Sequence, residues 1–327
     1  MKLPKSLSLA NLPTKIEKLE RLSKSLGDLE IYVKRDDQTG TEVSGNKVRK
    51  LEFAVQEALN QGCDYLITCG GIQSNHARAT AAVAAKLGMG AYLVLKGNSD
   101  EEIDGNYFLD KILGANIHFI TLEEYMEKRG MIMEEIKESL AVKGHKAYIL
   151  PEGASNGIGT FGYYKAMEEI LHQEKEMGIH FDAIVTTVGS GGTYAGLFYA
   201  NKINKSNADI YGINIAGDAD YFKKRINELL QEAAMYTGKE IQYTQEELRI
   251  IDGYVGDGYA LSRPEELIFI QQMAQLEGII LDPVYTAKAM YGLVEEIRKG
   301  TFKDYKKLLF IHTGGIFSLF SSRNQFY

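Results

Sequence analysis

From residue 48 onwards, short apolar runs alternate with longer amphipathic stretches along this chain. The apolar runs have the length of buried strands, and the amphipathic stretches have the spacing of helices. The pattern predicts strands at 64–69, 91–95, 116–120, 147–150, 182–188, 210–215 and 307–311. It predicts helices at 48–60, 76–87, 106–113, 123–142, 163–176, 194–203, 218–236, 262–277 and 286–299. Alternation of this kind is typical of mostly parallel sheets that are covered by helices.

The alternation is interrupted once, by a glycine-rich stretch at residues 151–162, and then restarts. We therefore predict an α/β protein with two lobes, each a mostly parallel sheet covered by helices. The smaller lobe is expected at residues 51–155, and the larger lobe at residues 1–50 plus 156–327. In such folds ligands bind where the carboxyl ends of strands meet the N-termini of helices. The loops that follow the predicted strands are therefore the places to look for chemistry.

Composition and charge narrow the class of function. A hydrophobic fraction of 45% and a charged fraction of 25% are typical of a globular protein. The net charge of −7 and the lack of a basic cluster argue against nucleic-acid binding. No apolar run approaches the roughly 20 residues of a membrane span, and the scattered histidines show no metal-binding spacing. Two cysteines, Cys63 and Cys69, and the absence of a signal-peptide pattern predict a cytoplasmic protein.

Lys47 stands in the run Ser44-Gly45-Asn46-Lys47-Val48-Arg49-Lys50, directly before the amphipathic stretch that begins at Val48. The cations two and three residues further on favour the neutral, nucleophilic form of its amine. A buried lysine of this kind is a candidate for Schiff-base chemistry with a carbonyl compound or with pyridoxal phosphate. The alternative is a solvated lysine at the start of a helix. This segment alone does not decide between the two.

Two glycine-containing loops each lie between a predicted strand and a predicted helix. The loop at 187–196 (Thr-Val-Gly-Ser-Gly-Gly-Thr-Tyr-Ala-Gly) allows backbone N–H groups to approach an anion. It is neither a Walker A motif nor a dinucleotide fingerprint, so it predicts another kind of phosphate cup or a plain tight turn. In the loop at 70–76, Ser74 and Asn75 either cap the next helix or help to hold a substrate carboxylate.

Two further loops carry side chains that are suited to catalysis. Gly153-Ala-Ser155-Asn-Gly157 matches the nucleophile elbow of serine hydrolases. The glycines that follow it and the lack of a separate oxyanion loop count against that interpretation. Tyr285, in Leu281-Asp-Pro-Val-Tyr285, and Tyr259 stand in loops, where a tyrosine can transfer protons if its pKa is lowered. Most of the 20 tyrosines must nevertheless be packing residues.

Together, these loops resemble the tryptophan-synthase-β-like (fold type II) pyridoxal-phosphate enzymes. The closest branch is the one that contains 1-aminocyclopropane-1-carboxylate (ACC) deaminase and D-cysteine desulfhydrase. The resemblance runs from about Val33 to Gly315 and rests on six ordered motifs. These are Lys34-Arg-Asp-Asp37, Gly45-Asn-Lys-Val-Arg-Lys50, Gly71-Ile-Gln-Ser-Asn-His76, Pro151-Glu-Gly-Ala-Ser-Asn156, Ser190-Gly-Gly-Thr193 and Asp282-Pro-Val-Tyr285. The resemblance implies a tryptophan synthase β-like fold, pyridoxal 5'-phosphate as cofactor, a small amino-acid substrate and a homodimer.

The resemblance also implies which residues hold the cofactor. Lys47 matches the lysine that carries it covalently, and Lys50 matches a contact to its phosphate. Asn75 matches the partner of the 3-hydroxyl group on the pyridine ring, and Thr313 looks like the neutral partner of the ring nitrogen. The phosphate cup corresponds to four consecutive residues, Ser190, Gly191, Gly192 and Thr193.

Five residues are implied to face the substrate. Ser74 matches the serine beside the α-carbon, and the backbone N–H groups from Ser74 through Asn75 to His76 are expected to bind the substrate carboxylate. Tyr259 and Tyr285 match two tyrosines that face the substrate. The family pattern also accounts for Pro151-Glu-Gly-Ala-Ser-Asn156 as a family loop rather than a nucleophile turn.

Three positions distinguish the two activities within the branch. ACC deaminases typically carry glutamate, glutamine and leucine where this chain has Thr286, His76 and Thr313. A carboxylate near the pyridine nitrogen keeps it protonated, which helps to open a cyclopropane ring that lacks an acidic α-hydrogen. Expulsion of a thiolate needs less help, so the sequence predicts conversion of D-cysteine to pyruvate, hydrogen sulfide and ammonia. ACC deamination to 2-oxobutanoate, a serine hydrolase using Ser155 and a non-catalytic phosphate-binding protein are the alternatives.

Overall fold

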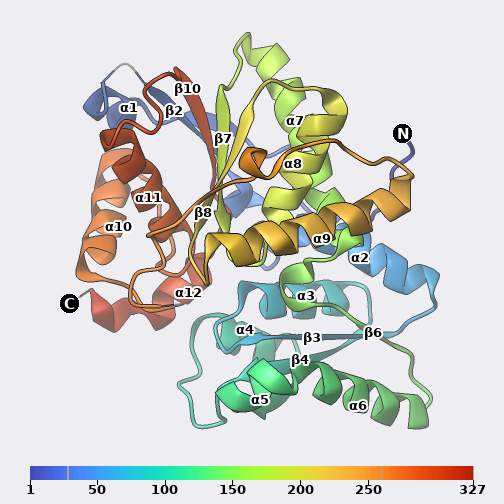
Figure 1. Ribbon diagram of the computed structural model, residues 1–327. Helices are drawn as coiled ribbons and strands as arrows, with labels where there is room; N and C mark the ends of the chain where they lie inside the picture. The colour runs from blue at the N-terminus through green and yellow to red at the C-terminus, as the bar shows by residue number, and fades with distance from the viewer. Residues whose placement is uncertain (28, 259, 327) are drawn as a thin grey trace.

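The computed structural model describes residues 1–27, 29–258 and 260–326, and it contains two sheets (Figure 1). The six-stranded sheet has the order β1 (Ile16–Lys18), β2 (Glu30–Lys34), β10 (Lys307–Ile311), β7 (Ala183–Val188), β8 (Asp209–Asn214) and β9 (Arg249–Ile251). The four-stranded sheet has the order β5 (Asn116–Ile120), β4 (Gly90–Lys96), β3 (Tyr65–Gly71) and β6 (Ala147–Ile149). All pairs are parallel except β1 with β2. The predicted fold class is therefore confirmed.

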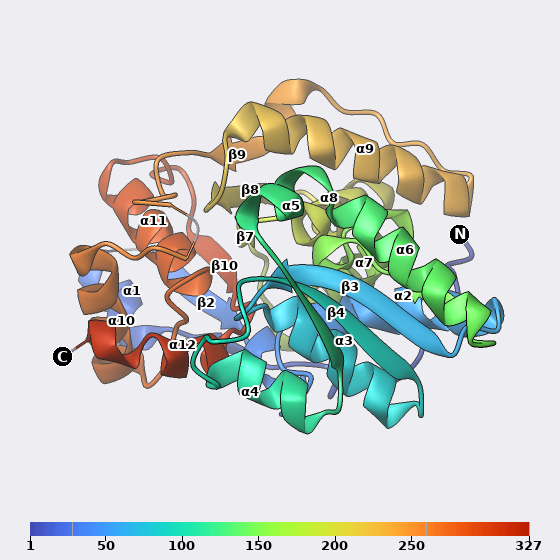
Figure 2. The ribbon, with the colours of Figure 1, turned by 90° about the horizontal axis from the view of Figure 1, so that it is seen from below.

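Helices cover the faces of both sheets. On one side of the larger sheet lie α7 (Gly157–Met177), α8 (Gly192–Asn204) and α9 (Ala219–Thr237), and on the other lie α1 (Glu20–Ser25), α10 (Pro264–Glu277) and α11 (Thr286–Arg298) (Figure 1). The smaller sheet is covered by α3 (Asn75–Lys86), α5 (Leu122–Glu127) and α6 (Arg129–Val142). Helix α2 (Lys47–Asn60) packs on α7 and α3 between the two sheets. Far apart in sequence, α4 (Gly105–Ile112) and α12 (Ile316–Ser321) lie side by side (Figure 2).

Two predicted helix boundaries are wrong. The helix predicted at 123–142 is two helices, because the chain leaves helical geometry at Lys128, with φ −124°. The helix predicted to begin at residue 163 begins at Gly157, where the Asn156 side chain accepts a hydrogen bond from the Gly159 N–H. The glycines that suggested a loop serve helix packing instead, because a Cβ at Gly162 would lie 2.4 Å from the Arg49 carbonyl oxygen. Glycine here allows α7 to approach α2 closely.

The hydrophobic pattern does not identify β1, β2, β9, α1 or α12, which are short or lie outside the alternating region. The strands of the smaller sheet all come from residues 65–149, whereas the larger sheet takes strands from both sides of that segment. The lobe boundaries at residues 51 and 155 stay a prediction. Within the described residues, no helix combines the length and the apolar character that a membrane crossing requires. The cytoplasmic location stays a prediction.

Candidate active site

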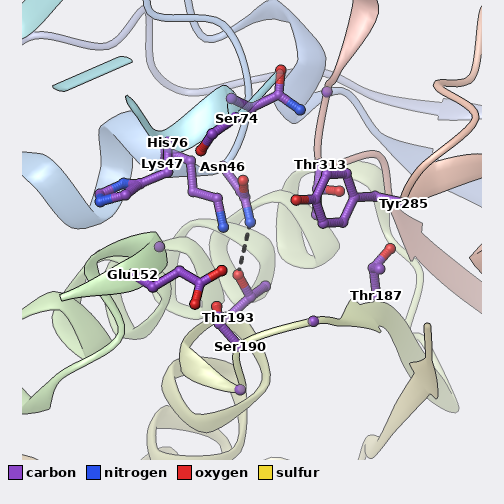
Figure 3. Close-up of a pocket in the computed structure, with 15 residues that line it drawn as sticks. Asn46, Lys47, Ser74, His76, Glu152, Thr187, Ser190, Thr193, Tyr285 and Thr313 are labelled. Atoms are coloured by element: carbon purple, nitrogen blue, oxygen red, sulfur yellow. Dashed lines mark hydrogen bonds between the residues drawn. The ribbon is translucent and has the colours of Figure 1, made fainter. Parts of the chain in front are cut away.

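One cavity lies where four strands end. The loops after β3 and β6 of the smaller sheet meet the loops after β7 and β10 of the larger sheet around it (Figure 3). Its lining residues are Asn46, Lys47, Ser74, Asn75, His76, Glu152, Gly153, Thr187, Gly189, Ser190, Gly191, Thr193, Tyr285, Thr313 and Gly314. The position of the cavity is the one expected for a ligand in a parallel α/β fold.

Lys47 is the first residue of α2, and its side chain extends into the cavity (Figure 3). The residue is partly exposed to the cavity, but its amine lies deep among protein atoms. This burial lowers the pKa of Lys47 to about 8, although the carboxylate of Glu152 opposes the shift. Gly153, with φ +66°, leaves room beside the amine, since a Cβ there would lie 3.2 Å from the Lys47 Nζ. Lys47 is thus a buried amine with a substantial neutral fraction near physiological pH.

Behind the cavity wall, Lys50 supports the glycine-rich loop. Its Nζ donates a hydrogen bond of 3.1 Å to Ser155 Oγ, which lies 2.8 Å from Ser190 Oγ. Lys50 is fully buried and forms no ion pair within the described residues, so burial, aided by the nearby Lys47, lowers its pKa well below the ordinary value. The N-terminus of α8 begins at Gly192 beside it. A buried amine without a counter-ion next to a helix N-terminus fits an anionic group such as a phosphate.

The first turn of α3 forms another wall of the cavity. Ser74 caps the helix, because its Oγ accepts a hydrogen bond of 3.1 Å from the Ala77 N–H. His76 is buried, with Nε2 2.8 Å from Thr68 Oγ1 and with Nδ1 lacking a partner among the described residues. Burial, followed by the charges of Lys47 and Lys50, lowers the pKa of His76 well below its ordinary value, so the ring is neutral. The wall therefore presents uncharged side chains and a helix N-terminus to a ligand.

On the side away from Glu152 lie Tyr285 and Thr313 (Figure 3). The Tyr285 ring packs over the backbone of Gly189, where a Cβ would lie 3.4 Å from the ring. The Tyr285 N–H donates a 3.0 Å hydrogen bond to Asp282 Oδ2, which fixes the turn before α11. The Thr187 hydroxyl is buried and has no hydrogen-bond partner among the described residues. Among the described residues that line the cavity, Glu152 carries the only carboxylate.

The structure brings most of the predicted site residues to this cavity. They are Lys47, Ser74, Asn75, His76, Ser190, Gly191, Thr193, Tyr285 and Thr313. Lys50 and Gly192 adjoin the cavity from behind, and Tyr259 lies outside the described residues. The hydroxyl of Ser155 contacts Lys50 and Ser190 and no histidine among the described residues, an arrangement that does not support a nucleophile elbow.

Sequence reasoning missed six lining residues, namely Asn46, Glu152, Gly153, Thr187, Gly189 and Gly314. Five of them lie inside the quoted motifs and loops, and Gly314 follows Thr313, so those segments were the available signal. Thr286, one of the three positions that distinguish the two activities within the branch, is not among the lining residues. Its hydroxyl donates a 2.7 Å hydrogen bond to Asp282 Oδ1. Thr286 therefore acts on the turn that carries Tyr285 rather than on a ligand directly.

A buried lysine with a lowered pKa, a glycine-rich anion site and a helix N-terminus around one cavity define the setting of a cofactor that is bound through a Schiff base and a phosphate. Residues 7–314 match the family described as "Pyridoxal-phosphate dependent enzyme", and the chain belongs to this family. Pyridoxal phosphate is therefore the cofactor, and the residues around the cavity fit it: Lys47 for the aldehyde and the cup at Ser190 to Thr193, backed by Lys50, for the phosphate.

Relatives narrow the membership to one branch. The chain is 42% identical to a putative 1-aminocyclopropane-1-carboxylate deaminase of Thermotoga maritima, over 98% of this chain and 99% of the relative. It is 39% identical to a bifunctional D-cysteine desulfhydrase/1-aminocyclopropane-1-carboxylate deaminase of Arabidopsis thaliana, over 98% and 80%. It is 37% identical to a D-cysteine desulfhydrase of Klebsiella pneumoniae, over 96% and 95%. The protein belongs to the branch of these enzymes.

Solved structures agree with this placement. The crystal structure of an ACC deaminase homologue has a TM-score of 0.90 and 39% identity, and the match covers 99% of this chain and 96% of that one. The structure of an O-ureido-L-serine synthase has a TM-score of 0.65 at 17% identity, with 95% and 92% covered. The second likeness shows a shared fold only. The protein is a pyridoxal-phosphate dependent lyase of the ACC deaminase and D-cysteine desulfhydrase family.

Proposed function

We propose that this protein eliminates the thiol of D-cysteine, so that D-cysteine and water yield pyruvate, hydrogen sulfide and ammonia. The observation that carries the proposal is the distribution of charge around the cavity. Thr313 and Thr187 present neutral hydroxyls, whereas the carboxylate of Glu152 lies on the side of Lys47 (Figure 3). A threonine as partner of the ring nitrogen does not hold a proton there as a carboxylate does.

The strength of the electron sink determines which substrates can react. When bound, pyridoxal phosphate supplies the sink that stabilises negative charge at the substrate's α-carbon. A neutral partner such as Thr313 leaves that sink weaker, which is sufficient where the α-carbon carries an acidic hydrogen and the leaving group is a thiolate. D-Cysteine meets both conditions, and ACC meets neither.

Each chemical task has a candidate residue. The backbone N–H groups of Asn75 and His76, at the start of α3, bind the substrate carboxylate. The Ser74 N–H, which was also expected to bind it, donates instead to the Gly71 carbonyl oxygen at 2.9 Å. The neutral amine of Lys47 removes the α-proton, with Ser74 as the alternative base. Tyr285 gives a proton to the departing thiolate, and Tyr259 is the second candidate for this step. Together these groups account for carboxylate binding, proton removal and expulsion of the thiol.

ACC deamination, with 2-oxobutanoate and ammonia as products, is the second candidate. The relative from Arabidopsis, whose name combines both activities, favours it, as does the putative deaminase from Thermotoga. The two reactions start from different substrates and give different 2-oxo acids, so one assay with separate substrates distinguishes them.

The test is a product assay on purified protein that has been loaded with pyridoxal phosphate. D-Cysteine, L-cysteine and ACC are supplied separately, and hydrogen sulfide, pyruvate and 2-oxobutanoate are measured. We expect hydrogen sulfide and pyruvate from D-cysteine at the highest kcat/KM. Lys47→Ala protein with the same amount of free cofactor is the control, because cysteine reacts with the free aldehyde. Preferential formation of 2-oxobutanoate from ACC would instead support the second candidate.

We also propose that the protein is a homodimer, as the family resemblance implies. Sedimentation equilibrium over a range of protein concentrations tests this, with a mass near twice the 36.5 kDa of one chain as the expected result. A mass of one chain at all concentrations would contradict the proposal. The assembly state is independent of the substrate assignment.

A further inference from the structure

Asn75 lines the cavity, and a buried chain of hydrogen bonds behind it holds its amide group. Asn106, in the first turn of α4, donates from Nδ2 to Asn75 Oδ1 at 3.0 Å and to the Gln73 carbonyl oxygen at 3.0 Å. Arg78, one turn along α3, donates from Nε to Asn106 Oδ1 at 3.1 Å. Arg78 and Asn106 are both 0% exposed. The chain therefore runs from the helix interior to the cavity wall without contact to solvent.

Arg78 determines the direction of the hydrogen bonds that link Arg78, Asn106 and Asn75. A guanidinium group has donors and no acceptor, so the oxygen of the Asn106 amide must face it. Its other nitrogens donate to the carbonyl oxygens of Glu42 at 2.6 Å and Ser44 at 3.0 Å, which fixes its orientation. The Asn106 NH₂ group then faces Asn75 and donates a hydrogen bond to its side-chain oxygen. What remains for the cavity is the NH₂ group of Asn75.

The polarity is stable over the physiological pH range. Burial lowers the pKa of Arg78 to about 10, and Asp110 and Glu42 oppose the shift, so the guanidinium remains charged and remains a donor. The amides of Asn75 and Asn106 do not titrate. Asp110, one turn further along α4, has no hydrogen-bond partner at either carboxyl oxygen among the described residues, and its burial raises its pKa well above the ordinary value.

We propose that Arg78 and Asn106 are positioning residues that present the donor end of the Asn75 amide to the 3-oxygen of the cofactor. The inference rests on the proposed role of Asn75 as the partner of that oxygen. A donor at this position stabilises the anionic form of the oxygen through a charge-assisted hydrogen bond. A reversed amide would bring its carbonyl oxygen against the same anion. Asn75 alone could adopt either orientation, and the buried chain selects one.

Two substitutions of Asn106 separate this role from a merely structural one. Asn106→Asp keeps an acceptor for Arg78 but offers Asn75 an acceptor in place of the donor, so the Asn75 amide must turn round. Asn106→Leu removes the bonds to Arg78, Gln73 and Asn75 alike and leaves the Asn75 amide free to turn. Asn106→Leu should therefore lower the stability of the fold more, and Asn106→Asp should weaken cofactor binding more. Asp100→Asn is the control, because it exchanges a carboxylate for an amide at an exposed residue before α4.

The readouts are cofactor affinity, the pH at which the visible band of the bound cofactor titrates, and urea unfolding of the cofactor-free proteins. For Asn106→Asp we expect about tenfold weaker cofactor binding, as for a hydrogen bond to a charged oxygen that is replaced by repulsion. Its titration midpoint moves upward, because a less stabilised anion holds its proton more tightly. Asn106→Leu should change the cofactor affinity and the titration midpoint less than Asn106→Asp does. It should nevertheless unfold at a lower urea concentration. Asp100→Asn should match the wild type.

The proposal would be overturned if the Asn106 variant that unfolds at the lower urea concentration is also the one that binds the cofactor more weakly. If Asn106→Asp does not fold, Asn75→Asp provides an independent test. Its carboxylate accepts the Asn106 NH₂ group as the native oxygen does, and it presents an oxygen to the cavity. Unchanged cofactor affinity and titration in Asn75→Asp would also overturn the proposal. None of these readouts uses a substrate, so a wrong substrate assignment under the proposed function leaves them unaffected and is recognised separately by the product assay.

Discussion

The side-chain amide of Asn46 donates a 3.0 Å hydrogen bond to the hydroxyl of Thr193 (Figure 3). Asn46 immediately precedes Lys47 at the start of α2, and Thr193 belongs to the glycine-rich loop at the start of α8. The bond therefore ties the predicted cofactor lysine to the predicted phosphate cup. In the proposed site pyridoxal phosphate reaches both groups at once, so this contact helps to fix the distance between its two proposed attachment points.

We expect Asn46→Ala to weaken cofactor binding about fivefold, because a neutral hydrogen bond contributes about 1 kcal/mol net. The measurement is titration of cofactor-free protein with pyridoxal phosphate, followed through its visible absorption. Gln56→Ala on the same helix is the control, since the Gln56 side chain donates a hydrogen bond to Asn60 at the surface. Equal losses in both variants would mean that the Asn46 bond has no special role in the cofactor site.

Lys47→Ala should remove the visible absorption of the bound cofactor and reduce turnover below detection. The reason is that the variant lacks the amine that attaches the cofactor and that is proposed to remove the α-proton. Absorption spectra of the dialysed protein and the product assay measure the two effects. Lys143→Ala, which changes an exposed lysine, should behave as the wild type. A Lys47→Ala protein that keeps the visible band after dialysis would contradict the assignment of Lys47 as the residue that attaches the cofactor.

The local features of this fold were predictable from the sequence where they depend on neighbouring residues. The apolar run that forms β7 ends in glycines, and that is enough to indicate a strand followed by a helix N-terminus. In contrast, the three residues of β1 are all half-buried and too few to show a period. They form a strand because β2 pairs with them. Gly162 lies in the first part of α7 and contacts the backbone of Arg49 in α2, and no local pattern reports that contact.

The site, like the fold, combines features that depend on neighbouring residues with features that depend on packing. Lys47, Ser74, Asn75 and Tyr285 stand in motifs, so their residue types and order identified them before their positions were known. The orientation of Asn75 depends on Asn106, 31 residues away in the chain, and such a contact is set by packing alone. Likewise, the carboxylate of Glu152 influences the amine of Lys47 although the two residues are 105 positions apart in the sequence. Distances and charges of this kind follow only from the folded chain.

The rate of cofactor attachment should depend on pH through Lys47. Its pKa of about 8 means that the reactive neutral amine increases as pH rises and levels off above about 8. The carboxylate of Glu152 raises this pKa by stabilising the ammonium form, so Glu152→Gln should move the midpoint to lower pH. Stopped-flow mixing of cofactor-free protein with pyridoxal phosphate across pH measures the midpoint. Glu134→Gln, at an exposed residue, is the control, and an unchanged or raised midpoint in Glu152→Gln would contradict the prediction.

Asp36 stabilises the region that carries Lys47. It is fully buried, and its carboxylate accepts two hydrogen bonds of 2.8 Å from Arg49, which stands two residues after Lys47. Tyr163 donates a further bond of 2.6 Å. Asp36→Asn leaves Arg49 with one carboxylate partner, Glu169 at 3.0 Å, and weakens the buried hydrogen bonds to a charged group. The variant should therefore lower the free energy of unfolding by about 2 kcal/mol. Urea unfolding of the cofactor-free protein measures this, with Glu134→Gln, from the exposed pair with Lys137, expected to cost less than about 1 kcal/mol.

The contribution of Asp36 should also depend on pH. Burial alone would raise the pKa of Asp36, but Arg49, Lys34 and Tyr163 together lower it by more, and the net shift is downward. A carboxyl group with a lowered pKa in the folded state stabilises the protein above its ordinary pKa and loses this effect as pH falls. The difference between wild type and Asp36→Asn should therefore shrink in acid. A difference that stays constant from neutral to acid pH would show that Asp36 is not ionised in the folded protein.

Ser155→Ala distinguishes a lyase from a serine hydrolase on the same chain. The Ser155 hydroxyl is bonded to Lys50 at 3.1 Å and to Ser190 at 2.8 Å and contacts no histidine among the described residues, so we assign it to the support of the phosphate cup. We expect the variant to bind pyridoxal phosphate several-fold more weakly, because Lys50 loses a buried partner. At saturating cofactor, however, its kcat for D-cysteine should stay close to that of the wild type, since no step of the elimination uses the hydroxyl. A nucleophilic serine would behave in the opposite way, because its removal typically costs several orders of magnitude in kcat. Loss of turnover on that scale with the visible band intact would therefore restore the nucleophile hypothesis.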